Sequence, residues 1–137
     1  MPIDWKNIDK EFKFKVPAKP TDGLWTLVRS YINGPTIIRL QASGRWTPIA
    51  GLPSCGADGL RHWAFCRDML LTKKAPLGAL IGKFGGSNGA ADEAEIFLVG
   101  AATVLSVEKA VGPLYLTIND APAHFDDNEG EIEVYIS

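Results

Sequence analysis

Glycine and proline interrupt this chain at short intervals, and no other feature of the sequence limits its fold as strongly. The 137 residues include 14 glycines and 9 prolines. Between these breaks lie short runs of β-branched, aromatic and aliphatic residues, which favour strands. The spacing therefore predicts many short strands joined by turns and disfavours long helices.

Several of these runs have the pattern of strands. Over residues 131–136, three aliphatic residues alternate with two glutamates and a tyrosine, as in an antiparallel strand with one buried face. Asn33-Gly34-Pro35 separates two β-favouring runs and predicts a β-hairpin. Roughly seven to nine short strands predict an all-β fold, a small β-sandwich of two antiparallel sheets. The other strands are expected over residues 24–32, 36–41, 79–84, 96–99, 103–107 and 114–118.

The apolar residues of these runs define the expected core. Residues 60–71 are expected to be irregular or a strand. Residues 87–95 are small, polar and acidic, and we expect them to form an exposed loop. The predicted core consists of Leu24, Val28, Ile38, Leu40, Leu80, Phe97, Val99, Leu114, Leu116, Ile132, Val134 and Ile136.

The chain length fits one domain, since domains of roughly 100–150 residues are the commonest. Residues 1–22 are predicted to form an N-terminal arm, in which a short strand would end at Pro17 and Pro20 because proline does not fit a central ladder. Residues 23–137 are predicted to form a single β-sandwich domain, since no linker or internal repeat divides them.

Charge and hydropathy exclude several classes of partner. The formal net charge is −2, and lysine and arginine are scattered, so the chain lacks the basic face that a nucleic acid requires. No apolar run approaches the roughly 18 residues of a membrane-spanning helix, so membrane insertion is not expected. The N-terminus has no apolar signal segment, which indicates a cytoplasmic protein as synthesised. Export without a classical signal stays open.

The densest group of polar residues lies between the last two predicted strands, over residues 119–130. It holds three aspartates, one glutamate and two asparagines. Asp, Asn and Gly favour turns, so a solvated acidic loop is one interpretation. Carboxylates this close repel each other, and a calcium ion with six to eight oxygen ligands would offset that repulsion. The residue types alone leave both interpretations open, and the spacing is not that of an EF-hand.

Several motifs of the second half carry a resemblance to a known family. They are Asn119-Asp120, Asp127-Asn128-Glu129-Gly130, and the segments at residues 76–83, 97–100, 112–116 and 134–136. With them the chain resembles the LecA-type (PA-IL-like) lectins, small bacterial calcium-dependent galactose binders, over roughly residues 76–137, and more loosely over residues 23–48. The resemblance implies a galactose-binding-domain-like, jelly-roll-like sandwich of two four-stranded sheets.

The resemblance also implies a calcium site with a specific set of ligands. Three side chains would bind the ion, and two backbone carbonyls would complete the protein's share of the shell. Two neighbouring sugar hydroxyls would take the remaining positions. The side chains are those of Asp120, Asp127 and Asn128, and the carbonyls are those of His124 and Pro48, with Thr47 as the alternative to Pro48.

Contacts to the sugar are less well matched. Asp120 would accept a hydrogen bond from a sugar hydroxyl while it binds the metal, and Asp127 stands where galactose binders have Asn. Cys55 and Asp58 occupy the positions of the family's sugar-contacting His and Gln. Trp46 lies two residues before Pro48, where it would either stack on a sugar or pack in the core.

These features predict a carbohydrate-binding module and not an enzyme, with galactose as the first candidate sugar and self-association suggested by the family's oligomers. One alternative is a calcium-stabilised structural domain in which Asp58 or Asp126 closes the site. The other is a cysteine-dependent hydrolase, which would need Cys66 or Cys55 against His62 or His124.

Overall fold

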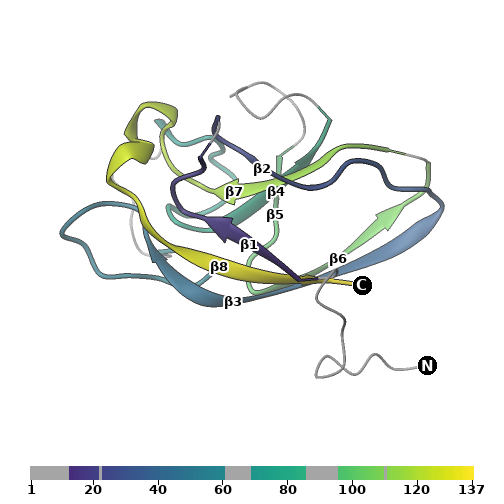
Figure 1. Ribbon diagram of the computed structural model, residues 1–137, viewed down its shortest axis with the longest axis horizontal. Coiled ribbons are helices and arrows are strands. Elements are labelled where there is room, and N and C mark those ends of the chain that lie inside the picture. Colours follow the sequence, from purple (N-terminus) through teal and green to yellow (C-terminus); the bar gives the residue numbers. More distant parts are fainter. Residues whose placement is uncertain (1–12, 22, 61–68, 86–95, 110) are drawn as a thin grey trace.

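Two antiparallel four-stranded sheets face each other in the computed structural model of the chain (Figure 1). The structure describes residues 13–21, 23–60, 69–85, 96–109 and 111–137. One sheet has the order β1-β8-β3-β6 and the other the order β2-β7-β4-β5, which confirms the predicted all-β sandwich. The strands are β1 (Lys13–Pro17), β2 (Thr26–Arg29), β3 (Thr36–Thr47), β4 (Leu80–Phe84), β5 (Ile96–Leu98), β6 (Ala102–Val107), β7 (Leu114–Ile118) and β8 (Glu129–Ile136).

The long strand β3 organises the first sheet. It pairs with β6 through its first half and with β8 from Leu40 to Thr47. Near the end of this ladder Gly130, with φ of 92°, lies opposite Trp46. A Cβ atom at Gly130 would lie 2.8 Å from the carbonyl oxygen of Arg45, so only glycine allows this approach. The pairing brings the residues after β3 next to those before β8.

The core lies between the sheets, where the predicted alternation places it. On β8 the side chains of Ile132, Val134 and Ile136 are buried, as expected for a strand with one face inward. Every residue of the predicted core is buried, except that Leu24 and Phe97 are partly buried and pack against the core.

The predicted hairpin over residues 24–41 is wrong. β2 pairs with β7 in one sheet, whereas β3 pairs with β6 and β8 in the other. Gly34 packs against the backbone of Lys109, where a Cβ atom would clash, and the chain crosses there between the sheets. Runs of β-favouring residues identify strands but not their partners, and here both edges of β3 are taken by other strands.

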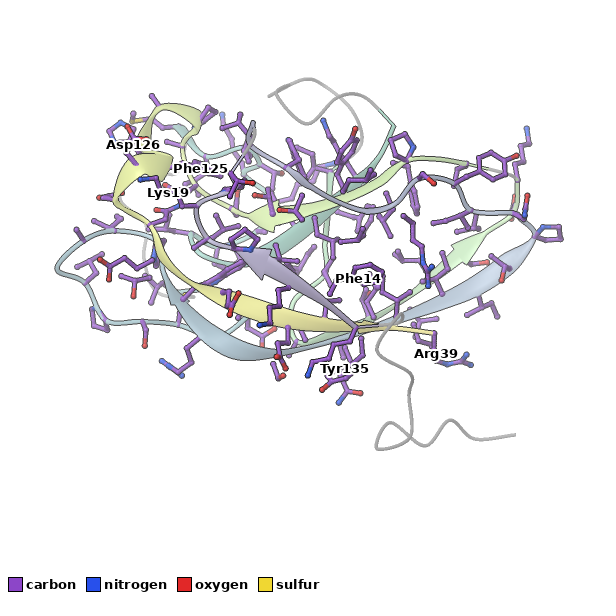
Figure 2. The ribbon with its side chains drawn as sticks, viewed as in Figure 1. Phe14, Lys19, Arg39, Phe125, Asp126 and Tyr135 are labelled. Carbon is purple, nitrogen blue, oxygen red and sulfur yellow. The ribbon has the colours of Figure 1, made fainter. Side chains whose placement is uncertain are left out.

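Part of the predicted N-terminal arm belongs to the sandwich. β1 lies within residues 1–22 and pairs with β8 along its whole length. Val16 is fully buried, and Lys13 forms an ion pair with Glu133 at 3.2 Å. Figure 2 shows Phe14 on the inner side of this sheet and Tyr135 on the outer side. Phe14 and Val16 add apolar area to the core, so the sheet begins at β1 and not at residue 23.

Two predictions concern residues that lie largely outside the described part of the chain. They are the irregular segment or strand over residues 60–71, of which residues 61–68 are not described, and the expected loop over residues 87–95. No helix in the described part of the chain is long and apolar enough to cross a membrane.

Gly130→Ala is expected to destabilise the fold by about 3 kcal/mol, because it combines a strained positive φ with a backbone clash. Gly85→Ala is the matched control. Gly85 also has a positive φ, 80°, but a Cβ atom there meets no described atom within 4 Å, so only strain of about 1 kcal/mol is expected. Urea denaturation measures both, and equal losses would contradict the close approach of β8 to β3.

Candidate functional site

The acidic segment between β7 and β8 is ordered by a short 3-10 helix, η4 (Pro122–Asp127). The side chain of Phe125 is buried and anchors the helix on the core, whereas Asp126 is exposed; both are labelled in Figure 2. The amide of Asn128 donates to the carbonyl oxygen of Phe125 at 3.1 Å and ends the helix. Asp120 before the helix and Asn128 after it are thereby brought to the same end of the sandwich.

Asp120 and Asn128 are buried polar residues, 3% and 4% exposed. Asp120 Oδ1 accepts a hydrogen bond from the amide of Ala121 at 2.7 Å, and Asn128 Nδ2 donates to the carbonyl oxygen of Ala18 at 2.8 Å. The other oxygen of Asp120, Oδ2, and the amide oxygen of Asn128, Oδ1, are buried without a hydrogen-bond partner among the described residues. Buried polar atoms without partners are uncommon, and a water molecule, an ion or a ligand group can each satisfy such an atom.

The loop that follows β3 packs against the acidic segment. The amide of Ala50 donates to Asp127 Oδ2 at 3.2 Å, and Pro48, two residues before Ala50, is buried. Figure 1 shows this loop and η4 at the same end of the sandwich. The two segments that the resemblance assigns to the calcium site therefore meet. Asp120, Asp127 and Asn128 supply oxygen side chains there.

A pocket of about 400 Å³ opens at this point. Asp120, His124 and Asp127 are its polar lining residues, so His124 contributes to the pocket as well as to η4. The rest of its lining is apolar, and no sequence pattern predicted this apolar surface. The apolar lining comes from Ile49, Ala50, Gly51, Leu52, Met69, Leu70, Leu77 and Ala121.

Burial raises the pKa of the Asp120 carboxyl from 3.8 to about 6, and the negative charge of Asp127 acts in the same direction. The Ala121 amide, the Asn128 side chain and His124 lower this pKa by smaller amounts. The largest cause of the raised pKa is the removal of the carboxylate from water, because the charged form loses hydration that the protein does not replace. A cation beside Asp120 would reverse this effect.

Trp46 and Cys55 lie near the site but do not face it. Trp46 is 1% exposed, and its Nε1 donates to the carbonyl oxygen of Gly78 at 2.6 Å, so its ring faces are not available to a sugar. Cys55 is also buried, and the two residues exchange backbone hydrogen bonds. Their packing closes the loop that carries residues 48–54. Of the two roles predicted for Trp46, the structure supports packing in the core, and the burial of Cys55 leaves its side chain little surface for a sugar.

Asp58 faces a different part of the molecule. Its Oδ1 accepts a hydrogen bond from the amide of Ala101 at 3.0 Å, in the turn between β5 and β6. It is not among the residues that line the pocket. The lining of the pocket therefore does not support a contact of Asp58 with a sugar, which stays a prediction.

Cys55 has no features of a nucleophile. Burial raises the pKa of its thiol to about 11, although the positive charge of Arg45 lowers it slightly, and nucleophilic attack needs the thiolate. Cys66 and His62, the other pair considered for a hydrolase, lie outside the described residues.

The assembled oxygen atoms suit a hard cation. No group of three or more His, Cys, Asp and Glu side chains that could hold a metal ion occurs in the described ranges, so amide and carbonyl oxygens would have to complete any shell. Two carboxylates, one amide oxygen and nearby backbone carbonyls are the donors that calcium prefers. The two unpartnered oxygens belong to this same set, and the residues therefore fit the ion that the resemblance implies.

Comparisons with known proteins bear on the fold. No protein-family model and no curated protein matches the chain. Among solved structures, the chain is similar to one described as "EclA N-terminal domain; PllA-like lectin", with a TM-score of 0.64 and 22% identity. The match covers 91% of this chain and 93% of that chain. At this identity the likeness establishes the fold, and it is consistent with the LecA-type sandwich that the sequence motifs predicted.

In chelator, Asp120→Asn is expected to stabilise the folded chain at about pH 7.5 and to lose that advantage as the pH falls toward about 4. The pKa of the Asp120 carboxyl is higher in the folded chain, so the folded state binds this proton more tightly than the unfolded state. Its contribution to the free energy of unfolding is therefore fully present below about pH 4 and is lost as the pH rises through about 6, by on the order of 3 kcal/mol.

Urea denaturation across this pH range measures the free energy of unfolding of both proteins. The other carboxylates titrate alike in the two proteins, so their contributions cancel in the difference. A difference between variant and wild type that is the same at every pH would contradict the raised pKa.

Proposed function

We propose that this chain is a calcium-dependent carbohydrate-binding module, with galactose as the first candidate sugar. The observation that carries the proposal is a pair of buried oxygens, Asp120 Oδ2 and Asn128 Oδ1, that have no hydrogen-bond partner in the part of the chain that the structure describes. A carboxylate with only one of its oxygens hydrogen-bonded is costly to bury, and a bound cation would offset that cost. Both oxygens belong to residues that the LecA-type resemblance assigns to calcium.

The proposed coordination shell uses oxygen atoms from two segments. Asp120, Asp127 and Asn128 supply side-chain oxygens, His124 its backbone carbonyl, and the loop after β3 the carbonyl of Pro48 or Thr47. Calcium accepts six to eight oxygens in flexible geometry, so room remains for ligand hydroxyls. The two carboxylates balance the charge of the ion.

Two neighbouring sugar hydroxyls would complete the shell from the pocket. Asp120 lines this pocket as well as carrying the unpartnered oxygen, so it can reach both ion and sugar. Because Cys55 and Asp58 face elsewhere, selectivity among sugars falls to the coordinated hydroxyls, to His124 and to the apolar lining. The solved structure with a similar fold is described as a lectin, which supports a binding module over an enzyme.

A calcium-stabilised structural domain is the alternative. It requires a further carboxylate to close the positions that would hold the sugar. Asp58 is hydrogen-bonded to the β5–β6 turn, and Asp126 is exposed on η4. This placement favours an open site.

Saturating calcium is expected to raise Tm by about 10 °C, since a ligand at about 100 times its Kd adds roughly 2.7 kcal/mol of stability. Asp120→Asn should abolish the increase because it removes a ligand charge. Asp126→Asn, which changes an exposed carboxylate on the same loop, should keep it. Thermal melts in calcium, magnesium and chelator measure these effects, and identical melts of the wild type would refute the cation site.

A glycan array probed with and without chelator is expected to show binding that requires calcium, strongest for glycans with terminal galactose. The coordination of two hydroxyls by the ion is the reason for the dependence. Binding that persists in chelator would exclude this mechanism. An array without signal, on a protein whose Tm rises in calcium, would support the structural alternative.

A further inference from the structure

The buried side chain of Asn119 connects the proposed cation site to the wall of the pocket. Asn119 is fully buried at the end of β7, directly before Asp120. Its Oδ1 accepts a hydrogen bond from the amide of Thr72 at 3.1 Å. Its Nδ2 lies within hydrogen-bonding distance of three backbone carbonyl oxygens, those of Thr72 at 3.0 Å, Ala75 at 2.8 Å and Pro76 at 3.1 Å.

The backbone next to this side chain adds further contacts to the same segment. The amide of Gly78 donates to the carbonyl oxygen of Asn119 at 2.8 Å, and the amide of Leu71 donates to that of Asp120 at 3.0 Å. Residues 71–78 are therefore held on Asn119 and Asp120 from both ends. Met69, Leu70 and Leu77, at the borders of this segment, form part of the apolar pocket wall.

The second part of the wall is hydrogen-bonded to the first. The carbonyl oxygen of Gly78 accepts the hydrogen bond from Trp46 Nε1. Trp46 pairs with Cys55 and closes the loop that carries Ile49 and Leu52, which also line the pocket. A continuous set of hydrogen bonds thus leads from Asn119 through Gly78 to the loop after β3.

We propose that Asn119 is a positioning residue for the glycan. Its side chain fixes the 72–76 part of the pocket wall relative to Asp120, and its backbone carbonyl holds Gly78, without either group binding the cation. This inference rests on the proposed function. In the described structure the amide oxygen and nitrogen of Asn119 point to the 72–76 backbone, so its loss should move the wall while Asp120, Asp127 and Asn128 keep their oxygens.

The test compares calcium affinity with glycan affinity in Asn119→Ala. Calcium is titrated into the calcium-free protein, and the methyl glycosides of galactose, fucose and mannose are then titrated into the calcium-loaded protein by calorimetry. We expect glycoside affinity to fall by about 10-fold or more, within the usual range of coupling between neighbouring groups. Calcium affinity should change by less than about 3-fold.

Thr117→Val is the matched control for lost stability. Thr117 is fully buried on the same strand, and its Oγ1 donates to the carbonyl oxygen of Leu24 at 2.6 Å, on a different segment. This variant also removes a buried hydrogen bond but should keep the wild-type ratio of glycoside to calcium affinity. Asn119→Ser, which keeps one donor, provides an intermediate if Asn119→Ala does not fold.

The outcomes separate the two proposals. A wild-type protein that binds calcium but none of the glycosides refutes the proposed function, and the role of Asn119 with it. A wild type that binds a glycoside, together with unchanged glycoside affinity in the Asn119 variants, refutes only the positioning role. Equal losses of calcium and glycoside affinity, or the same loss in Thr117→Val, would also overturn it.

Discussion

The pairing of β8 with β3 is the constraint on which the rest of the site depends. Antiparallel register places Trp46 opposite Gly130 and Thr47 opposite Glu129, so the two segments that leave the sheet emerge side by side. One carries the loop with Pro48, and the other is η4 with its acidic residues. A register shift of one residue would turn the buried face of β8 outward and separate these segments. The alternation of buried and exposed residues along β8 therefore determines the position of the oxygen atoms of the proposed cation site as well as that of the core.

Much of this arrangement follows from local sequence, and some of it does not. The alternation over residues 131–136 predicted β8 and its buried face, and the acidic residues after β7 predicted where the oxygens gather. The partner of each strand was not predictable, because β-branched residues before and after Gly34 favour strands whichever sheet they join. Nor could spacing reveal that Trp46, Cys55 and Asp58 face away from the pocket. Packing in three dimensions determines which way a side chain faces, and the sequence left both core packing and sugar stacking open for Trp46.

The apolar part of the pocket could not be predicted for a related reason. Ile49, Leu52 and Met69 come from segments distant in sequence, with no periodic pattern to distinguish them from core residues. Asn119 gave a stronger signal, since it lies in the Asn119-Asp120 motif, but an asparagine beside an aspartate resembles turn chemistry or a metal ligand equally well. Its actual contacts are to backbone carbonyls and an amide, which carry no sequence signature.

The burial of Asp120 links the stability of the fold to its proposed ligand. A carboxylate that is 3% exposed, with one oxygen unpartnered in the described structure, weakens the metal-free fold at neutral pH. The same desolvation strengthens attraction to a cation, because fewer water molecules compete and the local dielectric constant is lower. An amide in place of the Asp120 carboxylate would remove both the cost of burying the charge and the attraction to a cation. Under the proposed function, the charge that destabilises the empty sandwich is the one that makes it a binding site, and ion binding becomes part of the folding free energy.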